Sequence, residues 1–437
     1  MKNMLLFGAG KSATELIFYL NDLVKNNVCT VTIVDANIEL LKNKLPENTF
    51  IHFEQIDILD ESERKRLIQS STVVISLMPP NLHYIIALDC ITYKKHLLTA
   101  SYIDEQIQLQ KEQIKNAGVL FLYEMGLDPG IDHMSAMKII HEIHSKGGKI
   151  DSFISHCGGL ISPECNTNPW SYKISWNPKN IILAGKSGAI YKRNGVIEET
   201  DYTTLFENCD TVDVNDEIGQ LSYYFNRDSL KYIQLYGLEN ANTFIRTTLR
   251  YSNFCQGWKW IVQLQLTDEQ ELYDTKYLTP NAFLKKHLEI FKLQHVYQSI
   301  NELSVIQQFD YLFNNNSDFI NKGKITAAEI LQSILEEKLK LVPNDKDMIV
   351  MLHEFEYTGS DKKYYTKSSL IVKGNNEYRT AMAKTVGLPL GIAARMLIEE
   401  KIAIVGLQIP TIEEIYEPVL EKLTEFGIQF EEKTTLL

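Results

Sequence analysis

The sequence has few cysteines, and none of them are closely spaced. Six cysteines are scattered through 437 residues, and no two of them form a C-x-x-C pair. A disulfide-stapled protein needs a denser and more regular set, so we expect reduced thiols and a cytoplasmic protein. The six are Cys29, Cys90, Cys157, Cys165, Cys209 and Cys255.

Long apolar runs and an excess of positive charge are also missing. No stretch reaches the roughly 20 apolar residues of a membrane span. The short run Met4–Phe7 leads directly into glycines, unlike a secretory signal. The formal net charge is −12, which argues against broad binding to nucleic acid or to an anionic membrane. A single basic pocket for an anionic small molecule is compatible with this charge.

The sequence contains enough apolar residues to form a large core. Hydrophobic residues make up 44% of the chain and charged residues 23%, as in folded globular proteins. At roughly 100–200 residues per domain, the length predicts two or three domains.

The first part of the chain, residues 1–130, alternates short apolar runs with amphipathic segments. This alternation predicts an α/β fold of the Rossmann type, a doubly wound parallel sheet with helices between the strands. In such a sheet the ligand lies beyond the carboxyl ends of the strands. The predicted strands are Met4–Phe7, Val28–Val34, Phe50–Gln55, Thr72–Leu77, His96–Thr99 and Val119–Tyr123.

After this first domain the pattern changes. Glycine, asparagine, proline and aromatic residues separate alternating segments such as Phe244–Leu249 and Trp260–Leu266, which predict strands. We expect residues 131–390 to form an α+β substrate and dimerisation domain on a mixed sheet, with a helical insertion lobe at about 275–345. Residues 391–437 should form helices that pack back on the first domain.

The strongest local signal is a G-x-G-x-x-A motif between a predicted strand and a predicted helix. It reads Gly8-Ala9-Gly10-Lys11-Ser12-Ala13. Gly8 permits a tight turn, Gly10 lets backbone N–H groups approach a pyrophosphate, and Ala13 allows close packing of helix on strand. In this context the motif predicts a dinucleotide-binding site.

An acidic residue, Asp35, ends the second predicted strand. At this position a carboxylate would bind the ribose hydroxyls of the adenosine. The same carboxylate repels a 2′-phosphate, and no Arg or Lys follows immediately in Val34-Asp35-Ala36-Asn37. The sequence therefore favours NAD over NADP as the cofactor.

Further candidate residues follow the later strands of the predicted sheet. Met78 and Pro79 follow the fourth strand, Ser101 and Tyr102 the fifth, and Leu127 and Asp128 the sixth. Because the carboxyl ends of parallel strands meet at one edge, these residues should line the same crevice. Asp128 precedes a Pro-Gly turn that leads into a helix, which is a rigid place for an acid.

Several separate motifs, in order along the chain, resemble the saccharopine reductase/dehydrogenase family. They are Glu124–His133 (EMGLDPGIDH), His156–Leu160 (HCGGL), Asn168–Trp176, Asn226–Ser229 (NRDS), Arg246–Tyr251 (RTTLRY) and Gly387–Pro389. The resemblance runs essentially from end to end. It implies a nucleotide domain, a substrate domain and a helical lobe, a homodimer, and NAD or NADP as the cofactor.

The family reaction implied by this resemblance is the oxidative deamination of saccharopine to glutamate and 2-aminoadipate semialdehyde, or its reverse, in lysine metabolism. It needs a proton acceptor for the amine, a polar group for the water, and cations for three substrate carboxylates. Fungal members that make lysine usually use NADP. Asp35 departs from that preference, so an NAD enzyme that degrades lysine is the more plausible expectation.

The resemblance also assigns roles to single residues. Arg227 and Arg246 are the carboxylate clamps, since a guanidinium is a planar bidentate partner. Ser101, Tyr102, Asn168 and Thr248 add substrate contacts. Asp128, Cys157 and Tyr102 lie beside the reacting carbon, and Asp128 is the first candidate for proton transfer if burial raises its pKa. The expected cofactor contacts are Gly8, Gly10, Lys11, Ser12, Ala13, Asp35, Met78, Pro79, Ser101, Leu127 and Asp128.

Other interpretations stay open on the sequence alone. A dehydrogenase of the carboxynorspermidine type would need an acidic pocket, which Arg227 and Arg246 disfavour. A nucleotide-sensing protein without turnover shares the same fold. Cys157 could be a small core residue. His133, His141 and His144 lie on one predicted helix without a clear carboxylate or Cys set, so no metal site is predicted.

Overall fold

A computed structural model describes residues 2–37, 49–314 and 318–437 of the chain. The chain forms two compact units. Unit 1 contains Met1–Gly148 and Leu370–Glu431, and unit 2 contains Lys149–Ser369 and Glu432–Leu437. Unit 2 is therefore inserted into unit 1, and the last residues of the chain return to it.

The units divide after Gly148 and after Ser369, whereas we placed boundaries near residues 130 and 390. One reason lies in α7, Ile131–Ser145. This helix packs against α15 of unit 1, where His141 Nδ1 lies 2.7 Å from the hydroxyl of Tyr416.

Unit 1 is built on a seven-stranded parallel sheet with the strand order β18-β6-β5-β4-β1-β2-β3. The strands are β1 (Asn3–Phe7), β2 (Thr30–Asp35), β3 (His52–Gln55), β4 (Val73–Ser76), β5 (His96–Thr99), β6 (Leu120–Leu122) and β18 (Gly406–Gln408). The predicted Rossmann-type sheet is confirmed. Six strands were predicted, and the seventh, β18, comes from the C-terminal part of the chain.

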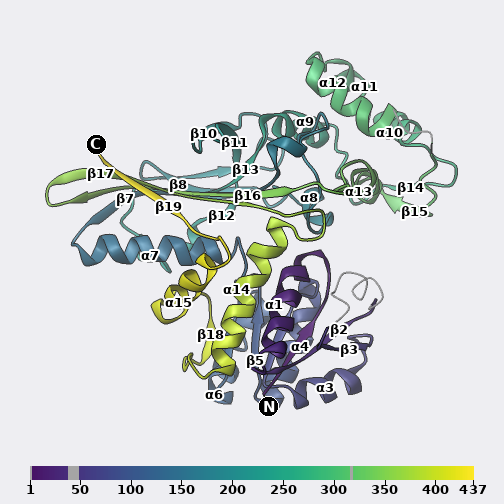
Figure 1. Ribbon diagram of the computed structural model, residues 1–437. Coiled ribbons are helices and arrows are strands. Elements are labelled where there is room, and N and C mark those ends of the chain that lie inside the picture. The colour runs from purple at the N-terminus through teal and green to yellow at the C-terminus, as the bar shows by residue number, and fades with distance from the viewer. Residues whose placement is uncertain (1, 38–48, 315–317) are drawn as a thin grey trace. The chain divides into compact units, whose positions relative to one another are not determined.

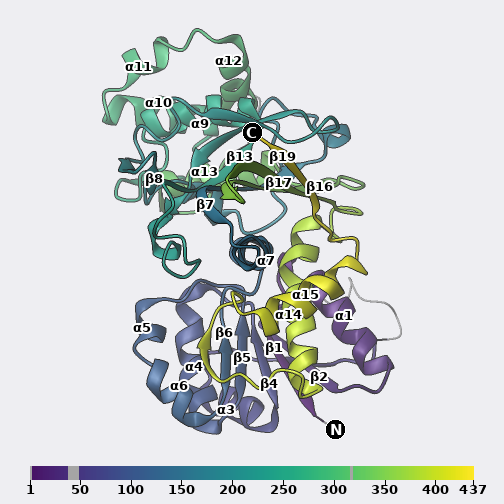
Figure 2. The same cartoon turned by 90° about the vertical axis from the view of Figure 1, so that its left-hand side faces the viewer.

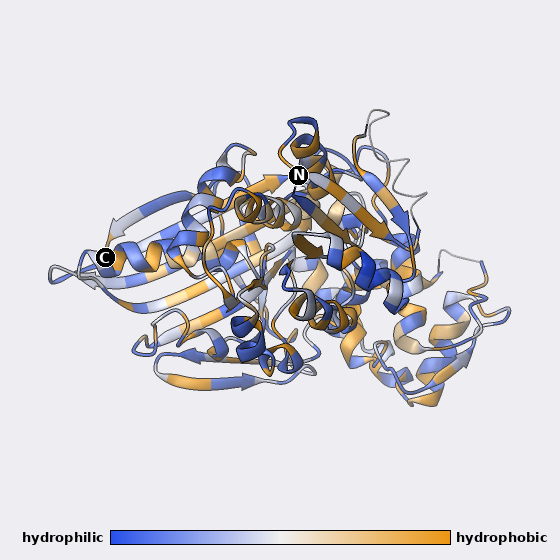
Figure 3. Cartoon of the chain, turned by 90° about the horizontal axis from the view of Figure 1, so that it is seen from below, coloured by the Kyte–Doolittle hydropathy of each residue, from blue (hydrophilic) through white to orange (hydrophobic). Residues whose placement is uncertain are grey.

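Helices cover both faces of this sheet. Figure 2 shows α4, α5 and α6 on one side and α1 and α14 on the other, and blue and orange residues alternate along the helices in Figure 3. The helices of unit 1 are the 3-10 turn η1 (Lys11–Ala13), α1 (Thr14–Lys25), α3 (Glu61–Ser70), α4 (Pro80–Tyr93), α5 (Glu105–Gln108), α6 (Lys111–Ala117), α7, α14 (Ala381–Ile398) and α15 (Glu413–Thr424).

The long helix α14 is apolar because it is a core helix of unit 1. It is long and apolar enough to cross a membrane, but 83% of it is buried. A Cβ at Gly387 would lie 2.9 Å from Leu16 of α1, and one at Gly391 would lie 2.6 Å from Tyr19. The two glycines therefore let α14 approach α1 closely. The helix begins well before the expected residue 391, with Thr380 as its N-cap.

Unit 2 is built on a ten-stranded mixed sheet, which confirms the predicted sheet type. Its main path is β10-β11-β13-β7-β16-β17-β19, and β8 joins β13 to β9 and β12. The strands are β7 (Lys149–Ile161), β8 (Ala189–Arg193), β9 (Val196–Thr200), β10 (Asp210–Asp213), β11 (Gln220–Phe225), β12 (Arg227–Asp228), β13 (Thr243–Arg250), β16 (Asp347–Gly359), β17 (Lys362–Lys373) and β19 (Glu431–Leu436).

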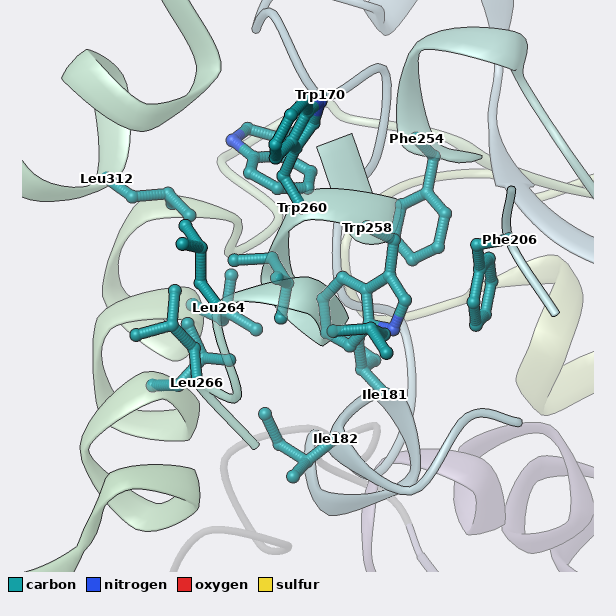
Figure 4. Packing of buried hydrophobic residues seen from close by; sticks show 14 of the residues in the cluster. Trp170, Ile181, Ile182, Phe206, Phe254, Trp258, Trp260, Leu264, Leu266 and Leu312 are labelled. Carbon is teal, nitrogen blue, oxygen red and sulfur yellow. The ribbon is translucent and has the colours of Figure 1, made fainter. Parts of the chain in front are cut away.

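A helical region of unit 2 packs around a cluster of large buried side chains (Figures 1 and 4). Phe254 and Trp258 stack at 5.2 Å between ring centroids. The elements are the 3-10 turns η2 (Pro163–Cys165) and η3 (Leu230–Tyr232), α8 (Lys179–Ile182), α9 (Ser252–Gln263), β14 (Leu272–Asp274), α10 (Pro280–Ile290), α11 (Gln294–Gln298), α12 (Leu303–Phe309), the π-helix η4 (Asp310–Asn314), β15 (Lys324–Thr326) and α13 (Ala327–Lys338).

One predicted strand in this region was wrong. Trp260–Leu266 was expected to be extended, but α9 continues to Gln263. The buried residues Phe254, Trp258 and Ile261 are spaced four and three apart, which is a helical face. The apparent alternation came only from the end of the helix and the residues that follow it.

Candidate active site

The glycine motif lies between β1 and η1, at the carboxyl edge of the unit 1 sheet. Gly8 has a φ of +91°, and a Cβ there would lie 2.8 Å from the carbonyl oxygen of Leu77, so the position requires glycine. At Gly10, a Cβ would meet nothing within 4 Å. The backbone at Gly10 is therefore open on the side where a ligand can approach. Lys11 is exposed and Ala13 is buried, as the motif predicts.

Asp35 lies at the end of β2, beside this glycine turn. Its Oδ2 accepts a hydrogen bond from the backbone N–H of Ala9 at 2.8 Å, and its Oδ1 accepts one from Asn37 at 2.8 Å. One carboxylate thus ties the end of β2 to the turn after β1. The arrangement suits a dinucleotide, with phosphate at the helix N-terminus and ribose near Asp35.

The ends of β4 and β5 bring two more groups of predicted residues to the same edge. Met78 follows β4, and its sulfur would lie 3.2 Å from a Cβ at Gly8. Pro79 is exposed before α4. Ser101 and Tyr102 follow β5 and are both half-buried.

Sequence reasoning missed a buried histidine that connects these strand ends. His83 of α4 is 2% exposed. Its Nδ1 lies 2.8 Å from Ser76 Oγ, and its Nε2 lies 2.7 Å from Ser101 Oγ. Desolvation by burial lowers the pKa of His83 to about 4, and Asp104 opposes this shift. A neutral ring donates through one nitrogen and accepts through the other. His83 therefore fixes the orientation of the Ser101 hydroxyl.

The segment after β6 places Asp128 and Tyr102 together. The hydroxyl of Tyr102 donates to Asp128 Oδ1 at 3.4 Å. Asp128 is half-buried and Leu127 is buried. Two candidate proton-transfer groups thus lie beside each other, and one of them, Tyr102, directly follows Ser101 in the chain.

A buried acid–base pair, Glu124 and His133, holds this segment in place. Glu124 Oε2 lies 2.9 Å from His133 Nε2 of α7, and Glu124 Oε1 accepts from the backbone N–H of Ile103 at 3.3 Å. Asp132 accepts from the N–H of Gly130 at 2.6 Å. These bonds join the turns after β5 and β6. The Glu124–His133 motif therefore contains Asp128 and also holds it rigidly in position.

In unit 2, Arg246 is a buried side chain in the middle of the sheet. It is 4% exposed, on β13, and its guanidinium lies 4.6 Å from the ring centre of Tyr232. Its backbone N–H donates to Ser229 Oγ at 3.0 Å. A buried, stacked guanidinium is well placed to recognise a carboxylate.

Arg227 lies in β12 (Arg227–Asp228). The residue before it, Asn226, is hydrogen-bonded to β13, the strand that carries Arg246. The N–H of Asn226 donates to the carbonyl oxygen of Arg246 at 2.9 Å. Arg227 is exposed and has a φ of +52°. The backbone therefore brings the positions of the two predicted clamps close together.

Thr248 and Cys157 are paired across β13 and β7. Thr248 is also opposite Tyr224 of β11. Cys157 is 6% exposed, whereas Thr248 is half-buried. Since residues two apart on a strand share a face, Thr248 lies on the same face of the sheet as Arg246.

Asn168, the remaining predicted substrate contact, holds a turn. Its Nδ2 donates to the carbonyl oxygen of Tyr172 at 2.9 Å, and its Oδ1 accepts from the N–H of Trp170 at 2.9 Å. Both ends of this amide have protein partners, so its structural role is clear. A role in substrate binding stays a prediction.

The comparisons with known proteins extend over the whole chain. The family description "Saccharopine dehydrogenase NADP binding domain" matches residues 4–122, and "Saccharopine dehydrogenase C-terminal domain" matches residues 126–428. Saccharopine dehydrogenase (NADP(+), L-glutamate-forming) of Saccharomyces cerevisiae is 32% identical over 99% of each chain, and that of Schizosaccharomyces pombe is 30% identical over 99% of each.

A longer relative and a solved structure agree with these matches. Alpha-aminoadipic semialdehyde synthase of Arabidopsis thaliana is 37% identical over 87% of this chain, which spans only 38% of that protein. The apo structure of saccharopine dehydrogenase (L-Glu forming) from Saccharomyces cerevisiae matches with a TM-score of 0.88 and 30% identity, over 100% of both chains.

Proposed function

Because this chain belongs to the saccharopine dehydrogenase family, we propose that it oxidises saccharopine with a nicotinamide cofactor, giving L-glutamate and 2-aminoadipate 6-semialdehyde. The reaction is reversible, so the same site would also catalyse the condensation and reduction. The observation that supports this proposal most is that the match continues through unit 2. A dinucleotide-binding sheet by itself is common to many dehydrogenases and specifies no substrate.

The proposed reaction breaks one C–N bond. A bound nicotinamide would supply the hydride acceptor for the lysine-derived carbon beside the secondary amine, and the amine would lose its proton. Water adds to the resulting imine carbon. The carbinolamine then collapses, so that the nitrogen leaves with glutamate and the carbon becomes the aldehyde. Each turnover thus consumes one water and one oxidised nicotinamide.

The residues of unit 1 would manage the protons of this reaction. Asp128 would accept the amine proton and pass it through the hydroxyl of Tyr102, 3.4 Å away. Ser101, held by His83, would orient the cofactor or the substrate beside them. Positioning of this kind contributes because misplaced groups lose much of their catalytic effect.

The residues of unit 2 would bind the anionic ends of saccharopine. Arg246 and Arg227 would clamp carboxylates, and Thr248 and Cys157 would line the strand face between the substrate ends. The buried guanidinium of Arg246 would bind a carboxylate strongly because few water molecules compete with the ion pair, whereas Arg227 is exposed.

For the cofactor, Asp35 supports NAD, whereas the names of the relatives and of the family domain include NADP. We base the proposal of NAD on the carboxylate at the end of β2, which would lie near a 2′-phosphate and repel it. Replacing Asp35 by Asn keeps an oxygen for the N–H of Ala9 and removes the charge. We expect Asp35→Asn to shift the ratio of kcat/KM for NADP over NAD upward by about tenfold, or ~1.4 kcal/mol.

The test of the function is a paired assay. The purified protein is mixed with saccharopine and either NAD or NADP, and nicotinamide reduction is followed by absorbance. Carboxynorspermidine serves as the competing substrate. Turnover of saccharopine supports the proposal. Cofactor binding without reduction by either amine would instead indicate a nucleotide-sensing protein.

A further inference from the structure

A series of hydrogen-bonded side chains crosses four neighbouring strands of the unit 2 sheet, from β13 through β7 and β16 to β17. Thr247 Oγ1 lies 2.6 Å from Nδ1 of His156, and His156 Nε2 lies 3.0 Å from Oε2 of Glu354. The hydroxyl of Tyr365 donates to the other oxygen of the same carboxylate. Each strand contributes one side chain, and we call these four residues the cross-strand network.

The cross-strand network lies on the face of the sheet opposite the proposed substrate contacts. Thr247 is paired with His156, and Thr248 is paired with Cys157. Because successive side chains on a strand point to opposite faces, these two pairs leave opposite faces of the sheet. Arg246 is two residues from Thr248 and lies on the Thr248 face. Thr247 is therefore flanked in the sequence by two proposed substrate contacts.

The hydrogen bonds of the network have a defined direction. Burial opposes ionisation of Glu354, but the hydrogen bonds from His156 and Tyr365 outweigh it and lower the pKa of this carboxyl. Glu354 is therefore a carboxylate at neutral pH, and it accepts a hydrogen bond from His156 Nε2. In a neutral ring the other nitrogen, Nδ1, then accepts from the Thr247 hydroxyl. The carboxylate thus orients the ring, and the ring holds the threonine.

The order of threonine, histidine and carboxylate matches that of a hydrolase triad. This hydroxyl is inaccessible, however, because Thr247 and His156 are each 1% exposed. The ring of Tyr223 also packs edge-on against His156, at 4.8 Å between ring centroids. A nucleophile needs space beside it for the reacting atom of a substrate. The network therefore holds positions and does not react.

Holding Thr247 in place also holds the strand that carries the proposed carboxylate clamp. Arg246 is adjacent to Thr247 in β13 and is buried. A rotation or slip of this strand would turn the guanidinium away from a substrate carboxylate. Misplacement of a binding group by about 1 Å can cost about 100-fold in rate.

We propose that His156 is a positioning residue for saccharopine, which through Thr247 fixes β13 so that Arg246 and Thr248 meet the substrate. The inference rests on the proposed function and deepens it. Glu354 and Tyr365 contribute by orienting the His156 ring.

Two substitutions of His156 separate its two hydrogen bonds. His156→Asn places an amide oxygen near the position of Nδ1, so it still accepts from Thr247 but does not reach Glu354. His156→Gln places an amide N–H near the position of Nε2, so it still donates to Glu354 but leaves Thr247 without its acceptor. We expect His156→Asn to keep the KM for saccharopine within about threefold of the wild type, and His156→Gln to raise it about tenfold. The KM for the cofactor should stay unchanged in both.

The threonine is tested by Thr247→Val, which keeps the shape of the side chain and removes the hydroxyl. This variant alone should raise the KM for saccharopine about tenfold. In the double variant with His156→Gln the KM should rise no further, because the same hydrogen bond is already lost. Two effects that multiply would overturn the proposal, since they would show that the residues act independently.

His287 offers a matched control in the helical region of unit 2. It is also fully buried, and its ring has two partners, the Tyr273 hydroxyl at 2.8 Å and the carbonyl oxygen of Leu264 at 2.9 Å. His287→Gln should lower the Tm and leave the KM for saccharopine unchanged, because KM does not depend on the amount of folded enzyme. An equal rise of KM in His287→Gln and His156→Gln would indicate general loosening of unit 2 and would contradict the proposal.

The remaining outcomes are distinguishable. If His156→Gln does not fold, Thr247→Val decides alone, and a wild-type KM in that variant refutes the inference. If the wild type oxidises saccharopine and both variants keep its KM, the proposed function stands and only this inference fails. If the wild type does not oxidise saccharopine with NAD or NADP, the proposed function fails, and this inference fails with it.

Discussion

We expect acid to destabilise unit 1 through His83. Burial lowers the pKa of this ring from 6.5 to about 4. The folded protein therefore keeps His83 neutral down to about pH 4, while the unfolded chain binds a proton below about pH 6.5. Between these values the unfolded state binds more protons. Stability contributed by this group is thus present at neutral pH and is lost as the pH falls.

The size of the effect follows from the two pKa values. Between pH 7 and pH 5 the equilibrium constant for unfolding rises by a factor of about 20 through this group, which lowers the free energy of unfolding by about 2 kcal/mol. A protonated His83 also donates through both nitrogens, so it can no longer accept from Ser76 or Ser101. The Ser101 hydroxyl would then turn, and activity should fall in the same pH range.

The assay compares the wild type with His83→Gln, which keeps one hydrogen bond and cannot titrate. Urea unfolding is measured at pH 7 and pH 5, and the ring pKa is measured by NMR. The variant should be less stable than the wild type at pH 7 by about 1–2 kcal/mol. This difference should shrink or reverse at pH 5. The same difference at both pH values, or a ring pKa near 6.5, would refute the reasoning.

Three further outcomes are expected. Arg246→Lys should raise the KM for saccharopine by about 10- to 100-fold and leave the KM for the cofactor nearly unchanged, because a bidentate contact is lost; equal changes in steady-state kinetics would indicate a folding role. Gly387→Ala should destabilise unit 1 by about 1–3 kcal/mol, because its Cβ would lie 2.9 Å from Leu16; an unchanged urea midpoint would contradict this. Lys173→Met should lower the free energy of unfolding by about 3–5 kcal/mol, since the buried Asp345 carboxylate loses its contacts of 2.8 and 2.7 Å to the Lys173 ammonium. Asp345→Asn in the same background should restore part of the thermal stability.

The parallel sheet of unit 1 could be predicted because short apolar runs alternate with amphipathic helical segments along the first part of the chain. The strand β18 could not, since it lies outside the alternating pattern of the first domain and pairs with β6, far away in the sequence. Periodicity needs a longer segment to be visible. The same limit explains Trp260–Leu266, where the end of α9 and the residues after it alternate by coincidence.

In the candidate site, too, some residues could be predicted from the local sequence and others could not. The glycine turn and Asp35 follow from local sequence, because one strand, one turn and one helix set their positions. His83 could not be assigned a role, since its partners Ser76 and Ser101 come from two other strand ends.

The insertion of unit 2 into unit 1 has a consequence for synthesis on the ribosome. Lys149–Ser369 must be made before α14 and β18 exist. At about 5–20 residues per second, the N-terminal strands wait roughly 13–50 s for them. During that time the free edge of β6 and the apolar side of α1 are uncovered in the nascent chain, where chaperones that bind unpaired strands and apolar helices would find their targets.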